Sequence, residues 1–505
     1  MAAPAVFLKF IDDNANKFIA RLGAAVAIPS VSGDGTHRPD VFRMSAWLDG
    51  QLKDLGVTTK LVDLGKHVMD GEELPLPPAI LGRIGDDPKK KTVLVYGHYD
   101  VQPAAGLVFC ERNTKARLGT SSYCVSGRAS KSDGWDTEPF KLVVEEKTGR
   151  LIGRGSTDDK GPILGWLNVL DAHKALGREL PVNMRFCFEG MEESGSEGLD
   201  DLIKSETAKG KGGWFDGVDC VCISDNYWLN TRTPCLTYGL RGLVYFKLTV
   251  SGPARDLHSG SFGRMVHEPM TDLVQLMSKL VAPDGTILVP GVEDLVSVAD
   301  AEEREIYEKL DYSVKDVEDA VGAPITISTD KVTVIMGRMR MPSLSLHGIE
   351  GAFYGPGSKT VIPASVSGKF SIRIVPPQTP ALIEPLVFTY VEQEFAKLNS
   401  KNKVKIENLN DGKPWVADHK HWNYEAASRA TEAVYGRSPD LTREGGSIPV
   451  TLTFAESLGV NVLLLPMGRG DDGAHSTNEK LDRSNFIEGS KLLGTYLYEV
   501  GAIKA

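Results

Sequence analysis

Hydrophobic residues in the first half of the chain follow helical and strand-like periods in alternation. Helices are predicted at residues 5–30, 40–55, 162–174 and 199–204, and strands at residues 61–64, 92–96, 182–188 and 218–223. Two of these strands, 92–96 and 218–223, are almost continuously apolar, which is typical of strands buried on both faces of a sheet. The alternation therefore predicts an α/β layer around a largely parallel sheet.

The pattern changes near residue 240. A strand with alternating apolar positions is predicted at 242–250. The segments after it mix helices with strands: helices at 269–280, 299–310 and 380–398, and strands at 332–336, 343–349 and 367–375. This order predicts an α+β domain at residues 240–413, inserted into an α/β domain made of residues 1–239 and 414–505.

Composition and charge narrow the classes of function. The 505 residues are 41% hydrophobic and 25% charged, as in globular proteins, and the net charge is −10. Because the basic clusters are short and mixed with acidic residues, binding to nucleic acid or to a membrane surface is not expected. No apolar run reaches the ~18–20 residues of a membrane helix, and no signal peptide is expected. The six cysteines are sparse, so a reducing compartment, the cytoplasm, is expected.

Five polar clusters carry the candidate chemistry, and most follow a predicted strand or precede a helix. They contain His98 with Asp100, Asp158 in the glycine-rich segment 153–161, Glu192 with Glu193, Asp225, and His475 in the segment 470–476. Each cluster alone also fits a structural role, such as a strand-end histidine, an N-cap or a solvated acidic turn. A nucleotide-binding loop at 153–161 is excluded, because the segment lacks both GxGxxG spacing and a Walker lysine.

Considered together, the five clusters favour a metal site. Strand ends in an α/β sheet converge on one edge, where binding sites form. Two histidines with several carboxylates make a mixed donor set that suits Zn²⁺ or Mn²⁺. Strand positions i and i+2 share a face, so Asp100 can orient His98. Of Glu192 and Glu193, one can bind metal while the other acts as a general base. Abundant carboxylate makes two ions with one bridging carboxylate a sensible arrangement.

The sequence resembles peptidase family M20 over nearly its whole length. Within that family it is similar to the cytosolic non-specific dipeptidases, which include the Cys-Gly metallodipeptidases. The segments that carry the resemblance are 96–103, 153–161, 189–196, 222–228, 256–260, 442–449 and 471–476.

This resemblance implies two divalent metal ions per subunit, Zn²⁺ or Mn²⁺. The implied ligands are His98, Asp158 and Asp225 for one ion, and Asp158, Glu193 and His475 for the other, with Asp158 bridging. Asp100 is then the residue that orients His98, and Glu192 is the general base. A cis peptide bond between Asp158 and Asp159 is also implied.

The family fold is a catalytic α/β domain with a binuclear metal site, interrupted by an α+β lid domain that also forms a homodimer. The predicted domains agree with this arrangement. The resemblance places His258 on the lid, where it donates a hydrogen bond to the oxyanion in the partner's active site. It also implies that Arg373 binds the free carboxylate of a dipeptide, with hydrogen bonds from Thr360 and Ser447.

One segment departs from the family pattern. Residues 106–132 make this region about two dozen residues longer than in similar dipeptidases, without a clear period. The segment is either a surface loop near the mouth of the site or a gene-model artefact such as translated intron sequence.

The sequence thus predicts a binuclear metal hydrolase that cleaves dipeptides with free termini, Cys-Gly among them. Two alternatives stay open. One is an M20-type aminoacylase or carboxypeptidase acting on other amides. The other is a catalytically impaired binding protein, against which the presence of every implied ligand and of Glu192 argues.

Overall fold

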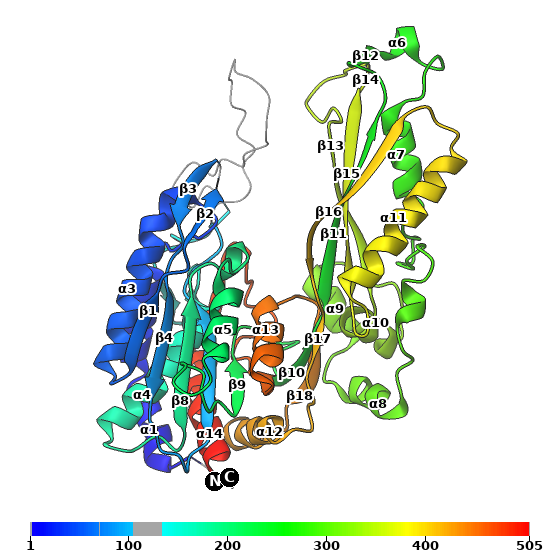
Figure 1. The fold of residues 1–505 in the computed structure, drawn as a ribbon. Coiled ribbons are helices and arrows are strands. Elements are labelled where there is room, and N and C mark those ends of the chain that lie inside the picture. Colours follow the sequence, from blue (N-terminus) through cyan, green and yellow to red (C-terminus); the bar gives the residue numbers. More distant parts are fainter. Residues whose placement is uncertain (1–2, 70, 105–133, 504–505) are drawn as a thin grey trace. The chain divides into compact units, whose positions relative to one another are not determined.

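The computed structural model describes residues 3–69, 71–104 and 134–503, and the chain divides into two compact units (Figure 1). The first unit comprises Met1–Thr237, Ala417–Leu441 and Thr453–Ala505, and the second comprises Tyr238–Val416 and Thr442–Leu452. Residues 442–452, within the range predicted for the α/β domain, thus group with the second unit. The predicted segment 106–132 lies outside the described residues.

The first unit is an α/β structure around a large sheet. Its helices are α1 (Ala5–Asp13), α2 (Ala15–Val26), α3 (Arg38–Asp54), α4 (Lys160–Ala175), α5 (Leu199–Ala208), α12 (Trp422–Tyr435), α13 (Pro449–Leu458) and α14 (Arg483–Gly501). Its main strands are β1 (Thr58–Val62), β4 (Ala79–Ile84), β5 (Thr92–His98), β8 (Asn183–Glu189), β9 (Cys220–Ile223) and β19 (Asn461–Leu464). Strand β10 (Cys235–Leu240) and helix α13 each have residues in both units. Short sheets pair β2 (Lys66–Met69) with β3 (Glu72–Pro75), and β20 (Lys480–Asp482) with β7 (Arg150–Ile152) and β6 (Val143–Glu145).

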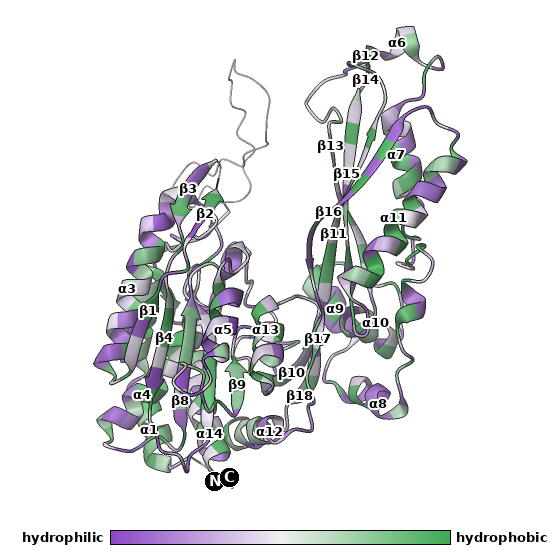
Figure 2. Ribbon diagram, in the orientation of Figure 1, coloured by the Kyte–Doolittle hydropathy of each residue, from purple (hydrophilic) through white to green (hydrophobic). Residues whose placement is uncertain are grey.

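The large sheet has the strand order β1-β4-β8-β5-β9-β19-β10, and β10 pairs further with β17 (Trp415–Val416) and β18 (Asp440–Glu444). Strands β8, β5, β9 and β19 are parallel, whereas β1, β4 and β10 are antiparallel to their neighbours. The prediction of a largely parallel sheet is therefore correct for the central strands and wrong at the edges. Burial distinguishes only the outermost strand β1, which is largely exposed. Every residue of β10 is buried, as in β5 and β9, and β10 is still antiparallel, so a continuously buried strand does not by itself fix the strand direction. Figure 2 shows β9 as a hydrophobic strand.

The helix predicted at residues 5–30 is two helices. Helix α1 ends at Asp13 and α2 begins at Ala15, with Asn14 between them donating a side-chain hydrogen bond to the carbonyl of Phe10 (2.9 Å). This local bond interrupts the helix without changing its apolar period. None of the described helices is both long and apolar enough to cross a membrane.

The second unit is an antiparallel sheet covered by helices. Its strands are β11 (Gly242–Ser251), β12 (Leu257–His258), β13 (Ser343–Glu350), β14 (Val361–Ile362), β15 (Ser365–Ile374) and β16 (Lys403–Gly412). Its helices are α6 (Ser259–Phe262), α7 (Pro269–Met277), α8 (Ala301–Lys309), α9 (Val314–Val321), α10 (Lys331–Met339) and α11 (Pro380–Lys397). The sheet order is β13-β15-β11-β16, and β12 pairs separately with β14.

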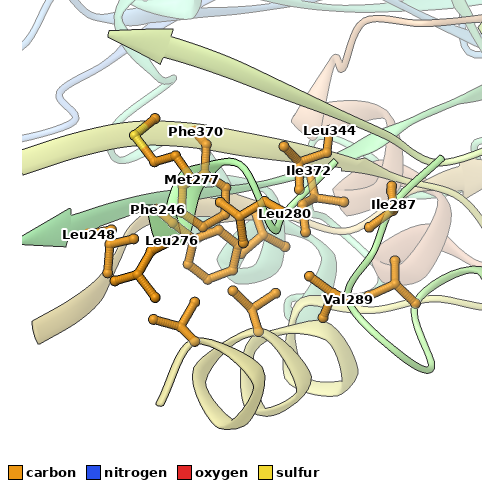
Figure 3. Packing of buried hydrophobic residues seen from close by; sticks show 14 of the residues in the cluster. Phe246, Leu248, Leu276, Met277, Leu280, Ile287, Val289, Leu344, Phe370 and Ile372 are labelled. Atoms are coloured by element: carbon orange, nitrogen blue, oxygen red, sulfur yellow. The ribbon is translucent and has the colours of Figure 1, made fainter. Parts of the chain in front are cut away.

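The core of this unit lies between the sheet and the helices α7 and α11 (Figure 3). Alternate residues of β11 are buried, and Phe246 stacks on Phe370 of β15 with ring centroids 5.1 Å apart. The predicted strand at 332–336 is wrong, because these residues lie in helix α10. Asp330 caps this helix by accepting a hydrogen bond from the Thr333 amide (2.8 Å), and its buried residues recur at helical spacing.

Candidate active site

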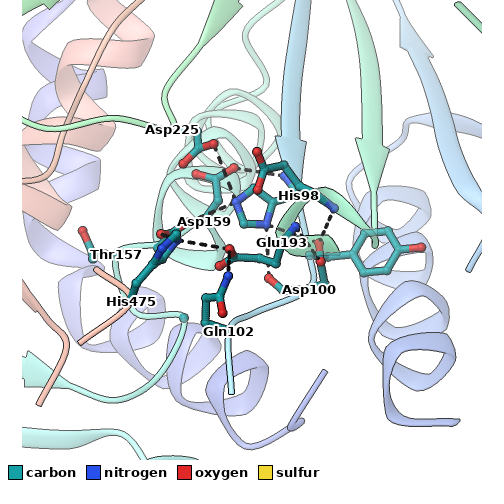
Figure 4. A network of polar contacts seen from close by, with 12 residues as sticks. His98, Asp100, Gln102, Thr157, Asp159, Glu193, Asp225 and His475 are labelled. Carbon is teal, nitrogen blue, oxygen red and sulfur yellow. Dashed lines mark hydrogen bonds and ion pairs between the residues drawn. The ribbon is translucent and has the colours of Figure 1, made fainter. Parts of the chain in front are cut away.

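The predicted metal ligands of the first unit gather at one edge of its sheet (Figure 4). His98 is the last residue of β5, and Asp225 follows β9 by two residues. Glu193 lies in the short 3-10 helix η3 (Glu192–Ser194) after β8, and Asp158 precedes helix α4. Because β8, β5 and β9 are parallel neighbours, the segments after them leave the sheet at the same edge.

The ring of His98 lies between carboxylates. Its Nδ1 is 3.3 Å from Asp100 Oδ1 and 3.2 Å from the Asp100 carbonyl oxygen, so both atoms can accept the Nδ1 proton. Its Nε2 then presents a lone pair, 3.1 Å from Asp158 Oδ1 and 3.6 Å from Asp225 Oδ2. This tautomer is the one that metal-binding histidines adopt when a carboxylate orients them.

The carboxylate of Asp100 also contacts the turn that carries the two glutamates. Its Oδ1 accepts a hydrogen bond from the Glu192 amide (3.3 Å), and its Oδ2 accepts one from the Glu193 amide (3.1 Å). Asp100 therefore fixes the position of η3 as well as the orientation of His98.

Asp158 lies between two histidines. Its Oδ1 faces His98, and its Oδ2 is 3.1 Å from Nε2 of His475. The same Nε2 is 3.1 Å from Glu193 Oε2. A carboxylate with one oxygen toward each histidine has the placement of a bridging ligand, and the Asp158–Asp159 peptide bond is cis, as predicted.

Electrostatics shows how strongly negative this site is. Among the described residues, no lysine or arginine forms an ion pair with Asp158, Glu193 or Asp225. Burial lowers the pKa of His98, but Asp225 and the other carboxylates outweigh it and raise that pKa well above its usual value. Hydrogen bonds to Asp158 and Glu193 raise the pKa of His475 to about 10. Burial raises the pKa values of Glu193 and Asp225.

This donor set fits a divalent cation. Ligand atoms of His98, Asp158 and Glu193 all lie within 4.8 Å of one another. Buried carboxylates with imidazole nitrogens and no basic partner are the donors that Zn²⁺ and Mn²⁺ take. A second acidic group, Asp471 with Asp472 and Asp482, does not fit a cation, because the Lys480 ammonium lies among its carboxylates at 2.6–2.7 Å.

Glu192, the predicted general base, lies next to Glu193. Burial, together with the charges of Asp225, Glu193 and Asp100, raises the pKa of Glu192 well above its ordinary value, although the charge of His98 opposes this. A raised carboxyl pKa suits a group that takes up a proton and releases it near neutral pH.

Some residues of the site were not predicted. Gln102 donates a hydrogen bond from Nε2 to Glu193 Oε2 (2.7 Å), and Asp159 accepts one from the His98 amide at Oδ2 (3.1 Å). Gln102 lies four residues after His98 in a segment that carries the family resemblance, which is the only sequence signal for it. The sequence gives no signal for Asp159 beyond its place next to Asp158.

The other predicted residues lie in the second unit, in two separate places. His258 on β12 pairs with Val361 on β14, and the Ser259 amide donates to the Thr360 carbonyl (3.2 Å), so His258 and Thr360 are neighbours. His258 is exposed, and its Nδ1 accepts a hydrogen bond from the Gly260 amide (3.0 Å). Because Nδ1 is the acceptor, the neutral ring carries its proton on Nε2.

Arg373 and Ser447 form the other place. Arg373 Nη1 donates to Ser447 Oγ (3.2 Å), and Ser447 Oγ donates to the carbonyl of Arg241 (2.5 Å). Among the described residues no carboxylate forms an ion pair with Arg373, and burial lowers its pKa. A half-buried guanidinium without a counter-charge is suited to bind a carboxylate from outside the chain.

The sequence is similar to those of known metallopeptidases. A sequence model of peptidase family M20/M25/M40 matches residues 125–499. The chain is 52% identical to the Cys-Gly metallodipeptidase dug1 of Schizosaccharomyces pombe, over 98% of this chain and 97% of that one. It is 41% identical to the Beta-Ala-His dipeptidase of Homo sapiens, over 98% of this chain and 92% of that one.

Solved structures of similar proteins have the same fold. The dipeptidase Dug1p of Saccharomyces cerevisiae superposes with a TM-score of 0.85 at 49% identity, over 99% of this chain and 98% of that one. Human carnosine dipeptidase 1 gives the same TM-score at 39% identity, over the whole of both chains. The chain therefore belongs to peptidase family M20/M25/M40 and is a metallopeptidase.

Proposed function

We propose that this chain is a metal-dependent dipeptidase that hydrolyses dipeptides with free termini, Cys-Gly among them. The observation that carries the proposal is the cluster of His98, Asp158 and Glu193 at the carboxyl edge of the sheet, with which no lysine or arginine of the described residues forms an ion pair. Cys-Gly enters as a substrate because relatives at 50–52% identity over nearly the full length are named Cys-Gly metallodipeptidases.

The proposed site holds two divalent ions, Zn²⁺ or Mn²⁺. Their ligands are His98, Asp158 and Asp225 for one ion, and Asp158, Glu193 and His475 for the other. This assignment of ligands to two ions is supported by the Asp158 carboxylate, which turns Oδ1 toward His98 and Oδ2 toward His475. When bound, such ions polarise the peptide carbonyl and make water more acidic.

In this proposal Glu192 is the general base. It takes the proton of the attacking water and delivers it to the amine of the leaving residue, so that one carboxyl group acts twice. The raised pKa of Glu192 supports this role, because the protonated form then lasts until the amine leaves. Asp100 keeps Glu192 in place through its backbone amide.

The two ends of the substrate need separate recognition. Arg373, placed beside Ser447, would bind the carboxylate of the dipeptide through its planar guanidinium. Thr360 and Ser447 would add hydrogen bonds. His258 would donate from Nε2 to the oxyanion of the tetrahedral state, a role supported by the hydrogen bond that leaves the proton on Nε2.

We further propose a homodimer through the second unit, in which His258 and Thr360 serve the active site of the partner. The cytoplasm is the proposed compartment, since the four described cysteines, Cys187, Cys220, Cys222 and Cys235, are all free and buried.

The first experiment measures Cys-Gly hydrolysis by the purified protein with and without added Mn²⁺ or Zn²⁺. We expect metal-dependent turnover, and we expect Glu192→Ala to lose about 10²–10⁴-fold in kcat while it still binds metal. Cleavage of acylated amino acids without cleavage of dipeptides would instead favour an aminoacylase. Absence of both activities in a metal-loaded protein would favour an impaired binding protein.

A further inference from the structure

One buried carboxylate outside the ligand set contacts the loop that leads to Asp158. Glu479 is fully buried, and its Oε1 accepts hydrogen bonds from the backbone amides of Thr157 (3.0 Å) and Asp158 (3.2 Å). Its Oε2 accepts from the Gly155 amide (3.0 Å) and from Nη1 of Arg154 (2.8 Å). Each oxygen therefore receives two donors, which uses the ordinary accepting capacity of a carboxylate.

Arg154 extends these contacts to a second segment. Its Nη2 donates to the carbonyl of Pro103 (3.1 Å), and its guanidinium lies over the ring of Trp135, 5.4 Å from the centroid. The Arg154–Glu479 pair thus joins the segment after His98 to the loop before Asp158 and to the segment after His475. The backbone carbonyl of Glu479 also accepts from the Gly153 amide (2.9 Å).

The contacts of Arg154 and Glu479 matter because the proposed ligands His98, Asp158 and His475 come from segments that are far apart in the sequence. Glu479 and the loop at 155–158 are separated by 321–324 residues. Residues 153–159 belong to no helix or strand, so regular hydrogen bonding does not hold Asp158 in place. Metal ligands need positions fixed within about 0.5 Å, and supporting hydrogen bonds provide this precision.

We propose that Glu479, paired with Arg154, is a positioning residue that fixes the backbone of Asp158 for metal binding. The inference rests on the proposed metal site and adds to it a support that lies outside the ligands. Its consequence is that loss of the Glu479 charge weakens metal binding more than it changes substrate recognition. The residues that contact substrate, by contrast, would change KM.

The test uses Glu479→Gln in the full chain. Glutamine has almost the same size, but its amide nitrogen would face backbone donors and the Arg154 cation. We expect the affinity for Mn²⁺, measured by calorimetry on the metal-stripped protein, to fall about 10–100-fold. We also expect excess Mn²⁺ to restore most of kcat for Cys-Gly with little change in KM.

A matched control removes another buried charge in the same unit. Asp171 on α4 is 6% exposed and forms an ion pair with Arg21 (2.6 Å), and it makes none of the contacts of the metal site. We expect Asp171→Asn to lower the melting temperature and to leave Mn²⁺ affinity unchanged. The inference is overturned if Glu479→Gln behaves in the same way, with lower thermal stability and unchanged Mn²⁺ affinity.

If Glu479→Gln does not fold, the Mn²⁺ affinity of Arg154→Lys tests the inference instead. Lysine keeps a cation beside Glu479, but it lacks the planar fork that reaches Glu479 and Pro103 together. We expect several-fold weaker Mn²⁺ binding, and unchanged binding would refute the inference. Failure of the proposed function is distinguishable, since the wild-type protein would then bind Mn²⁺ without hydrolysing Cys-Gly.

Discussion

At the scale of single residues, Arg373 offers the sharpest test of substrate recognition. We predict that Arg373→Lys raises KM for Cys-Gly about 10–100-fold, because lysine keeps the charge but loses paired hydrogen bonds to a carboxylate, each contributing about 1.5–3 kcal/mol. Steady-state kinetics measures the change. The control substrate is the dipeptide amide, which lacks the carboxylate. We expect its KM to be about the same for the wild-type protein and for Arg373→Lys. An equal loss for both substrates would contradict the assignment.

The sequence indicates single residues well where their partners are close along the chain. The spacing of His98 and Asp100 predicts that their side chains lie close together, and they are 3.3 Å apart, although β5 ends at His98 and Asp100 follows the strand. Gln102 and Glu479 could not be found in this way, because their partners are distant in the sequence. Gln102 contacts a residue 91 positions away, and Glu479 contacts residues more than 300 positions away. A polar side chain with a distant partner has no periodic signature, so only the folded chain reveals it.

At the scale of helices and strands, hydrophobic period predicted the central strands β5, β8 and β9 and the first helices of the chain, and it failed where residue preference and position disagree. Residues 332–336 are rich in β-branched side chains, which favour strands, yet they form part of α10. A cap at Asp330 and burial on one face decide in favour of the helix. The antiparallel strands β4 and β10 were not predicted although most of their residues are buried, because Gly82 and Gly239 interrupt their apolar runs.

Helix α10 gives a prediction of its own. A Cβ added to Gly337 in this helix meets no atom within 4 Å, so we expect Gly337→Ala to stabilise the protein by about 0.5–1 kcal/mol. The midpoint of urea unfolding measures the effect. Gly161→Ala is the contrasting variant: its Cβ would lie 2.2 Å from the Ser156 carbonyl oxygen, so it should be strongly destabilising. If Gly337→Ala were less stable than the wild-type protein, the placement of Gly337 in helix α10 would be contradicted.

At the scale of the whole molecule, the second unit separates the residues proposed to bind substrate. Arg373 pairs with Leu243 near the start of β11, whereas β12 with His258 follows the far end of β11 at Ser251. The eight residue steps from Leu243 to Ser251 span about 26 Å at ~3.3 Å per residue. One dipeptide cannot bridge that length, so Arg373 and His258 of the same chain cannot serve the same substrate molecule. This separation is the strongest argument for the proposed dimer.

The dimer can be tested by mixing two inactive variants. His258→Ala keeps its own Glu192 but offers no oxyanion donor to its partner, while Glu192→Ala lacks the base but offers His258. In a mixed dimer, the active site of the His258→Ala chain would receive His258 of the partner subunit. Random reassociation of equal amounts makes half of the dimers mixed, each with one complete site, so about a quarter of wild-type activity should return.

The control for this experiment is a mixture that cannot complement. Combining His258→Ala with a double variant that carries both His258→Ala and Glu192→Ala leaves every site without the oxyanion donor, so activity should stay at the level of the single variants. Light scattering would establish the dimer in each preparation. If the first mixture remains as inactive as its components although mixed dimers form, His258 acts within its own chain. The substrate would then have to bind in a position other than the one proposed, because Arg373 and His258 of one chain lie too far apart along β11 to contact the same dipeptide.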